Sequence, residues 1–293
     1  MFLKLKLKSE KSVELILLFC ASISVLSVLF ISVFIFQRGA PLFSKVSVFD
    51  FLFGTDWLPG NETNPRYGIL PFILGSLYVT FGALLLSVPI GIMTAVFMAE
   101  IATPKVAEIL RTVIQLLAGI PSVIYGFFGV IVISTFVRNA FGGTGYSVLS
   151  ASIILAIMTL PTIVNVSEVS LRSLSDELKA GSYALGATRW QTIRKVLIPT
   201  ASSGIVAGIV LGMGRALGET MAVLMVAGNA PIMPGGPLSK VRTLTMNIVT
   251  DMGYASGDHL TALFSTSMVL FLFILILNLL VNYISNKTRM EVV

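Results

Sequence analysis

The sequence predicts an all-α protein that crosses a membrane with six transmembrane helices. Of its 293 residues, 55% are hydrophobic and only 12% are charged, whereas a soluble domain carries about 25% charged residues. Long uncharged stretches recur along the chain, and lysine and arginine are unevenly distributed between the segments that join them. The mean hydropathy of +0.93 agrees with this class. The net charge of +6 is therefore expected to set topology in a membrane rather than to indicate a nucleic-acid partner.

Six predominantly apolar stretches approach or exceed the ~20 residues that a transmembrane helix needs. They lie near Val13–Phe36, Leu70–Met98, Thr112–Val137, Val148–Val166, Val196–Val226 and Leu260–Ile284. Pro89, Pro121 and Pro161 fall inside or at the edge of three of these stretches. Helix breaks at these prolines should face other helices or a cavity, because lipid cannot satisfy a freed backbone group.

The positions of lysine and arginine predict the orientation. With the amino terminus inside, the cytoplasmic segments carry 13 of the 20 basic residues, the outer segments carry 6, and Arg215 is the remaining one. Positive charge collects on the cytoplasmic side, so both termini are predicted to be cytoplasmic. Residues 1–12 and 287–293 then form cytoplasmic tails, and residues 13–286 form a single transmembrane domain. A cytoplasmic loop is expected within that domain at about residues 168–196.

The fifth predicted span contains two charged residues, which have opposite signs. Between Val196 and Ser239, Arg215 and Glu219 are the only charged residues, and a charge at mid-membrane costs roughly 2.5–3.5 kcal/mol on insertion scales. At about 100° per residue, both fall on the helix side that carries glycines at intervals of four. That stripe consists of Gly204, Gly208 and Gly212. Small residues at this spacing let helices approach closely, so both charges are predicted to point into the protein.

Two interpretations of this pair remain open. Arg215 and Glu219 could form a structural ion pair, as buried pairs often do, although the cation precedes the anion, which is the less favourable order within a helix. Alternatively, the pair lines a polar pathway, which is the usual reason for ionisable groups inside a membrane. An arginine suits an oxyanion because its planar fork donates two parallel hydrogen bonds and stays charged.

A charged segment between the fourth and fifth predicted spans reads SLSDELKAGSYALGATRWQTIRKVLIPTA. It predicts a short helix on the membrane surface over about residues 175–185. Ser173 and Asp176 have the spacing of a capping box, and the acidic Asp176 and Glu177 suit the first turn of a helix. Gly186 is placed to end it.

This segment resembles the EAA loop of binding-protein-dependent ABC importer permeases. That loop has Glu-Ala-Ala, three residues, a glycine, nine residues, and then a hydrophobic residue, any residue, a hydrophobic residue and proline. Here Gly186 and the proline of VLIP, Pro199, keep the spacing. Ala180, Gly181 and Ser182 stand where the family has Glu-Ala-Ala. The resemblance implies that the short helix docks into a cytosolic ATPase and couples it to the spans.

Three stretches in order resemble the phosphate-uptake permeases within this superfamily, and the PstC-type more than the PstA-type subunit. They are GIPSVIYGFFG, YALGATRWQTI and GRALGETMAVLMVAGN. The resemblance implies a type I ABC importer permease fold in a prokaryotic plasma membrane. It also implies that Arg215 contacts phosphate during passage. Glu219 would then accept a hydrogen bond from a protonated phosphate oxygen, which sulfate lacks at neutral pH.

The expected partners follow from the same resemblance. They are a PstA-type sister permease, two copies of an ATPase and an extracytoplasmic phosphate-binding protein. The chain lacks the G-x-x-x-x-G-K-[ST] phosphate loop, so Mg-ATP would be bound by the ATPase and not by this chain. The chain has one cysteine and one histidine, His259, and shows no catalytic or metal-ligand constellation. We therefore expect a transport subunit rather than an enzyme, without a metal or cofactor of its own.

Two other functions are compatible with these residues. The first keeps the ABC importer and changes the cargo to another oxyanion, such as sulfate or molybdate. The second is a self-contained secondary transporter or channel that uses Arg215 and Glu219 as an ion gate. The surface loop argues against the second function, as does the lack of obvious inverted repeats.

Overall fold

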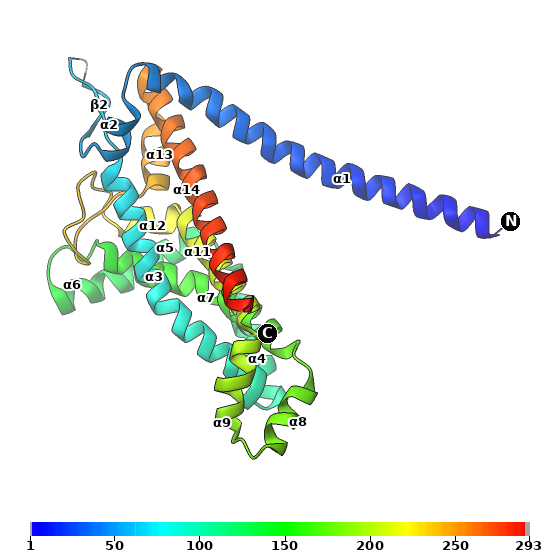
Figure 1. The fold of residues 1–293 in the computed structure, drawn as a ribbon. Coiled ribbons are helices and arrows are strands. Elements are labelled where there is room, and N and C mark those ends of the chain that lie inside the picture. Colours follow the sequence, from blue (N-terminus) through cyan, green and yellow to red (C-terminus); the bar gives the residue numbers. More distant parts are fainter. Residues whose placement is uncertain (1, 62, 291–293) are drawn as a thin grey trace.

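A computed structural model describes residues 2–61 and 63–290, and within these residues the chain is mostly helical (Figure 1). Five stretches are long and apolar enough to cross a membrane: Val13–Ser44, Leu70–Ile101, Ser122–Phe141, Val148–Arg172 and Gly257–Leu279. A bent pair, Arg189–Thr200 and Ser202–Gly218, gives a sixth if it is counted as one span. The predicted all-α membrane fold is confirmed, and the placement of both termini in the cytoplasm stays a prediction.

The amino-terminal half begins with a long helix, α1 (Phe2–Gly39), that extends away from the other helices (Figure 1). The last turns of α1 contact the first turns of the carboxy-terminal helix α14 (Gly257–Met290), where Phe34 and Phe264 pack edge to face. After it come η1 (Ala40–Ser44), α2 (Val48–Phe53), the antiparallel strands β1 (Trp57–Leu58) and β2 (Arg66–Tyr67), and α3 (Leu70–Val96). This hairpin and α2 lie at one end of the molecule, opposite the end that carries α8 (Asp176–Ala184) and α9 (Arg189–Thr192) (Figure 1).

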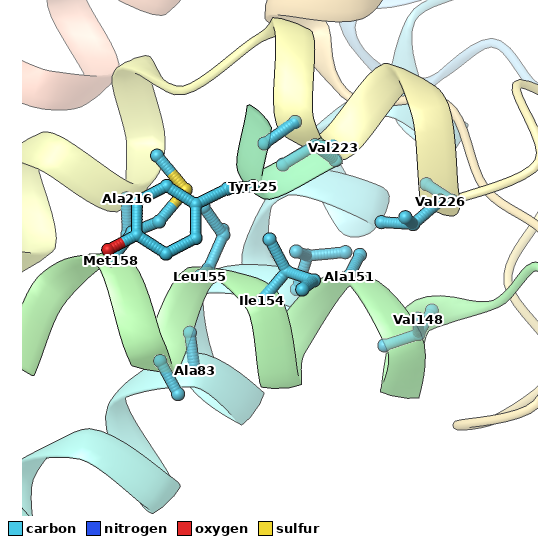
Figure 2. Close-up of a cluster of buried hydrophobic side chains, with 14 of the residues drawn as sticks. Ala83, Tyr125, Val148, Ala151, Ile154, Leu155, Met158, Ala216, Val223 and Val226 are labelled. Carbon is cyan, nitrogen blue, oxygen red and sulfur yellow. The ribbon is translucent and has the colours of Figure 1, made fainter. Parts of the chain in front are cut away.

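The core of the molecule forms around α7 (Val148–Arg172), which packs against α3 and α11 (Ser202–Gly218). Figure 2 shows Ile154, Leu155 and Met158 of this helix pointing toward side chains of neighbouring helices. Small residues at facing positions, such as Ala83 and Ala216, allow the close approach. The fourth predicted span was too short, since α7 continues to Arg172.

The third predicted span, Thr112–Val137, is wrong as one helix. A separate amphipathic helix, α4 (Pro104–Gly119), ends before Pro121, and Ile120 has the extended values φ −71° and ψ 127°. Proline lacks the backbone N–H and disfavours helical geometry in the residue before it. The crossing segment is therefore built from α5 (Ser122–Phe128), the π-helical η3 (Gly129–Ser134) and α6 (Thr135–Phe141).

The fifth predicted span, Val196–Val226, is also broken. It bends by 68° between Thr200 and Ser202. The bend follows the π-helical η4 (Ile193–Leu197) and the short α10 (Ile198–Thr200), which contains Pro199. A second break comes at Glu219, whose extended backbone (φ −71°, ψ 132°) separates α11 from α12 (Met221–Val226). The last two helices are α13 (Leu244–Met252) and α14, and α14 contains the sixth predicted span.

Candidate functional site

The glycine stripe of α11 faces α7. A Cβ atom on Gly204 would overlap Ser170 Oγ, and one on Gly212 would lie 2.9 Å from Ile163 Cγ1. Gly208 is also close to α7, since a Cβ atom there would lie 3.2 Å from Val166 Cβ. No larger side chain fits at these positions without moving the two helices apart. The stripe therefore fixes α11 directly on α7.

Arg215 does not lie on this packed face, although the helical wheel predicts that it does. The buried row of α11 continues from Gly212 to Ala216 and Leu217, and Arg215 is exposed. A row of residues four apart rotates by about 40° at each step. By residue 216 the covered face has therefore turned about 100° away from Arg215. The prediction that both charges project from the packed stripe is wrong for Arg215.

The exposed face of α11 carries two further glycines next to Arg215. Nothing lies within 4 Å of a Cβ built on Gly214 or Gly218, and Leu211 on the same helix is 57% exposed. We call the surface formed by Leu211, Gly214, Arg215 and Gly218 the open face of α11. It is narrow and carries one cation, and no side chain of the described residues covers it.

Glu219 occupies the break between α11 and α12. It is half-buried, and its Oε1 accepts hydrogen bonds from the backbone N–H groups of Thr220 and Ala222, each at 3.2 Å. Its carbonyl accepts a hydrogen bond from Thr245 Oγ1 at 3.1 Å. The carboxylate therefore caps the start of α12, which is why the chain leaves the helix here. Within residues 2–61 and 63–290 no ion pair joins Glu219 to Arg215.

Buried hydroxyl groups surround Glu219. A cavity of about 10 Å³ is lined by Glu219 together with Ser76, Thr80 and Thr243. This volume holds at most about one water molecule, so an oxyanion does not fit beside Glu219 in this conformation. Sequence reasoning missed these hydroxyl groups, because serine and threonine are common in membrane helices and their positions carry no periodic signal.

The EAA-like loop, residues 173–199, has its predicted helix, α8, but not the predicted cap. Ser173 ends α7 and donates from Oγ to the carbonyl of Ser170, so it does not cap α8. A capping box is present instead between Thr188 and Gln191, at the start of α9. Gly186 between the helices has φ +80°, a left-handed conformation that favours glycine.

The tip of this loop is exposed. Asp176, Glu177, Ala180 and Gly181 are exposed on α8, and Leu185 is 91% exposed. The other predicted loop residues lie toward the body of the molecule: Ser182 shares a hydrogen bond of 2.9 Å with Thr192, and Pro199 lies in α10. The tip of the loop therefore exposes the apolar Leu185 together with the acidic Asp176 and Glu177, and no described residue covers it.

At the end of the molecule that carries the β1–β2 hairpin, four side chains contact Asp251 beside a cavity of about 660 Å³. Its oxygens accept hydrogen bonds from Trp57 Nε1 at 2.9 Å, Tyr254 Oη at 2.8 Å and Arg242 Nη1 at 3.3 Å. His259 Nε2 lies 3.3 Å away from Oδ2, so this histidine is part of the cluster. The hydrogen bond to Asp251 raises the pKa of Tyr254. Only 4% of the Asp251 side chain is exposed, so the cluster is a structural centre of this end.

No group of three or more histidine, cysteine, aspartate or glutamate side chains in the described part of the chain could hold a metal ion. The geometry therefore offers a cation on an open helix face, a carboxylate at a helix break and an exposed loop tip.

Comparison with known proteins gives the family. Residues 87–290 match the family described as "Binding-protein-dependent transport system inner membrane component". The chain is 43% identical over 276 residues to "Probable ABC transporter permease protein YqgH" of Bacillus subtilis, covering 92% of this chain and 89% of that protein. It is 35% identical over 244 residues to "Phosphate transport system permease protein PstC" of Pasteurella multocida, covering 76% and 75%.

Solved structures share the fold. A chain of the MetNI methionine ABC transporter in an inward-facing conformation superimposes with a TM-score of 0.57 at 20% identity, covering 75% of this chain and 94% of that chain. At this identity the match shows the fold alone, which is that of type I ABC importer permeases. The chain belongs to the binding-protein-dependent inner-membrane permeases of ABC importers, in which a separate subunit hydrolyses ATP.

Proposed function

We propose that this chain is a permease subunit of an ATP-driven phosphate importer and forms half of the translocation pathway. A PstA-type sister permease would form the other half. Two copies of a cytosolic ATPase that binds Mg-ATP, and an extracytoplasmic phosphate-binding protein, would complete the complex. The likeness to phosphate permeases named PstC supports the cargo, and the position of Arg215 supports the pathway.

The exposure of Arg215 carries the proposal. The side chain lies on the open face of α11, in the bent segment that is long and apolar enough to count as a sixth span. A guanidinium group in hydrocarbon costs roughly 2.5–3.5 kcal/mol or more, so this face needs a protein or aqueous neighbour. A second permease packed on Gly214 and Gly218 would supply that neighbour and leave Arg215 at the seam between the two chains. At this seam its planar fork is available to the oxygens of phosphate.

Glu219 supports the selection of phosphate over sulfate as the transported anion. Both backbone hydrogen bonds to its carboxylate end on Oε1, which leaves Oε2 as an acceptor. Monohydrogen and dihydrogen phosphate can donate to such an acceptor, whereas sulfate repels it and has no proton to give. The closed cavity beside Glu219 implies that α11 and α12 move away from α3 before the anion reaches this oxygen.

The test uses the complete importer in proteoliposomes, with Arg215→Ala and Glu219→Gln in this chain. Arg215→Ala should abolish phosphate uptake while the subunits still co-purify. Glu219→Gln should narrow the ratio of phosphate-stimulated to sulfate-stimulated ATPase activity, because the amide can donate a hydrogen bond to sulfate. Unchanged phosphate uptake by a normally assembled Arg215→Ala complex would refute the pathway role. An unchanged selectivity ratio in Glu219→Gln would refute the discrimination by Glu219.

A different oxyanion is the second candidate. The relative that is 43% identical has a name that states a permease and no cargo. Stimulation of ATPase activity by phosphate, sulfate and molybdate, tested one at a time on the complete importer, decides between them. A response to molybdate or sulfate alone would replace the phosphate assignment.

A further inference from the structure

Two buried carboxylates lie near the end of the molecule that carries α8 and α9. Glu100 belongs to η2 (Phe97–Ile101), the π-helical continuation of α3, and only 8% of its side chain is exposed. Glu168 lies in the last turns of α7, and only 4% of its side chain is exposed. Burial of a carboxylate costs several kcal/mol unless cations or hydrogen bonds compensate for it. The partners of these two residues therefore show what each one holds in place.

Both helices of the EAA-like loop contact Glu100. Lys179 Nζ of α8 lies 2.9 Å from Glu100 Oε1, and Arg189 of α9 donates from Nη2 to the backbone carbonyl of Glu100. Glu100 Oε1 has no hydrogen-bond partner in the described part of the chain, so Lys179 holds it by charge rather than by a directed hydrogen bond. Ala180 stands where the family's loop has its glutamate, and the neighbouring Lys179 supplies a polar anchor of opposite sign.

Glu168 connects the same π-helical turn to two further helices. Its Oε1 accepts hydrogen bonds from Arg111 Nη2 of α4 at 2.5 Å and from Arg172 Nε of α7 at 2.8 Å. Arg172 also donates from Nη2 to the carbonyl of Met98, inside η2, at 2.7 Å. The hydrogen bond to Glu168 raises the pKa of Arg111, which keeps the cation charged. Through these bonds η2 is tied to α4 and α7.

Apolar packing joins the same elements. Met98 of η2 is buried in one cluster with Ile114 of α4, Leu171 of α7 and Ile193 of η4. Both η2 and η4 are π-helical turns, which occur frequently at functional sites. The turn η2 is thus fixed on one side by the loop helices and on the other by the membrane helices.

We infer that η2 receives the movement of the EAA-like loop, with Glu100 and Glu168 as positioning residues that pass it to α3, α4 and α7. A push on α8 then moves these three helices with it, in addition to the direct chain connection from α9 to α11. This inference rests on the coupling to an ATPase in the proposed function and does not depend on which anion is carried.

The first experiment compares transport with ATP hydrolysis in proteoliposomes that contain the complete importer. Glu100→Gln and Lys179→Met should each lower the phosphate imported per ATP by roughly 5-fold, a typical coupling between sites. The double variant should lower it no further, because both changes remove one contact. Glu14→Gln is the matched control: it makes the same carboxylate-to-amide change at an exposed position of α1. Two results would refute the role of Glu100 and Lys179. One is the same amount of phosphate imported per ATP in all variants, and the other is a larger loss in the double variant than in either single variant.

The second experiment does not depend on the cargo. Spin labels on Ser175→Cys, at the N-cap of α8, and on Ile109→Cys of α4, with Cys20→Ser, report the distance between these helices in the complete importer. The mean distance should stay the same in the nucleotide-free and ATP-trapped states, and it should differ between these states once Lys179→Met is added. A distance that changes between the states in the Lys179 background would overturn the inference. A complex that hydrolyses ATP without importing phosphate refutes the cargo instead, and the distances still decide the inference.

Discussion

Replacement of Asp251 by alanine should destabilise the end of the molecule that carries the β1–β2 hairpin. The change removes the acceptor for Trp57 Nε1 and Tyr254 Oη and the counter-charge of Arg242. A buried donor left without an acceptor costs about 1–3 kcal/mol. Trp57 is 6% exposed and the Arg242 side chain is 12% exposed, so neither can turn fully to water. If one of the two donors costs about 1 kcal/mol and the other about 2 kcal/mol, the free energy of unfolding falls by about 3 kcal/mol.

At about 2.1 cal/mol/K of unfolding entropy per residue, a loss of about 3 kcal/mol in this chain of 293 residues corresponds to a fall of roughly 5 °C in apparent Tm. The measurement is thermal unfolding of the purified chain in detergent. Trp57 and Trp190 are the only tryptophans, so Trp190→Phe makes the emission report on Trp57 alone. The emission of Asp251→Ala should shift to longer wavelength as the indole N–H gains water. Asp251→Asn keeps an acceptor and should lose less stability.

A Tm and a Trp57 emission that both remain unchanged in Asp251→Ala would contradict a structural role for Asp251. The control is Lys45→Met, which breaks the exposed ion pair between Lys45 and Asp258 at the same end. Exposed pairs contribute about 0–1 kcal/mol, so this variant should leave the Tm nearly unchanged.

Two glycine substitutions test the local geometry. Gly204→Leu would collide with Ser170 on α7, and it should lower the Tm of the chain and its yield from membranes by separating α11 from α7. Gly186→Ala places a Cβ at φ +80° and should cost about 1–2 kcal/mol in the turn between α8 and α9, which pull-down assays should show as weaker retention of the ATPase. Gly253→Ala, at φ −69° with open space around it, should leave both measurements unchanged.

Features that depend on local composition and period could be predicted from the amino-acid sequence alone. Length of uncharged stretch is a property of the chain alone, so the membrane class and the approximate position of most spans were predicted correctly. Helix α8 and the glycine that ends it were also predictable, because Gly186 marks a backbone turn that few other residues adopt. Glycines at intervals of four predicted that α11 packs closely on another helix, and the structure identifies that helix as α7.

Only the tertiary structure decided which face of α11 carries Arg215 and where the fifth span breaks. The wheel assigned Arg215 to the packed face because it assumed a neighbour parallel to the helix axis, whereas α7 follows a row that rotates around α11. The break at Glu219 depends on capping of the next helix. Glu100 meets Lys179 across 79 positions of sequence, and no local period reports such a contact. Burial and pairing of charges are set by whichever elements meet in space, so the chain's order alone left them open.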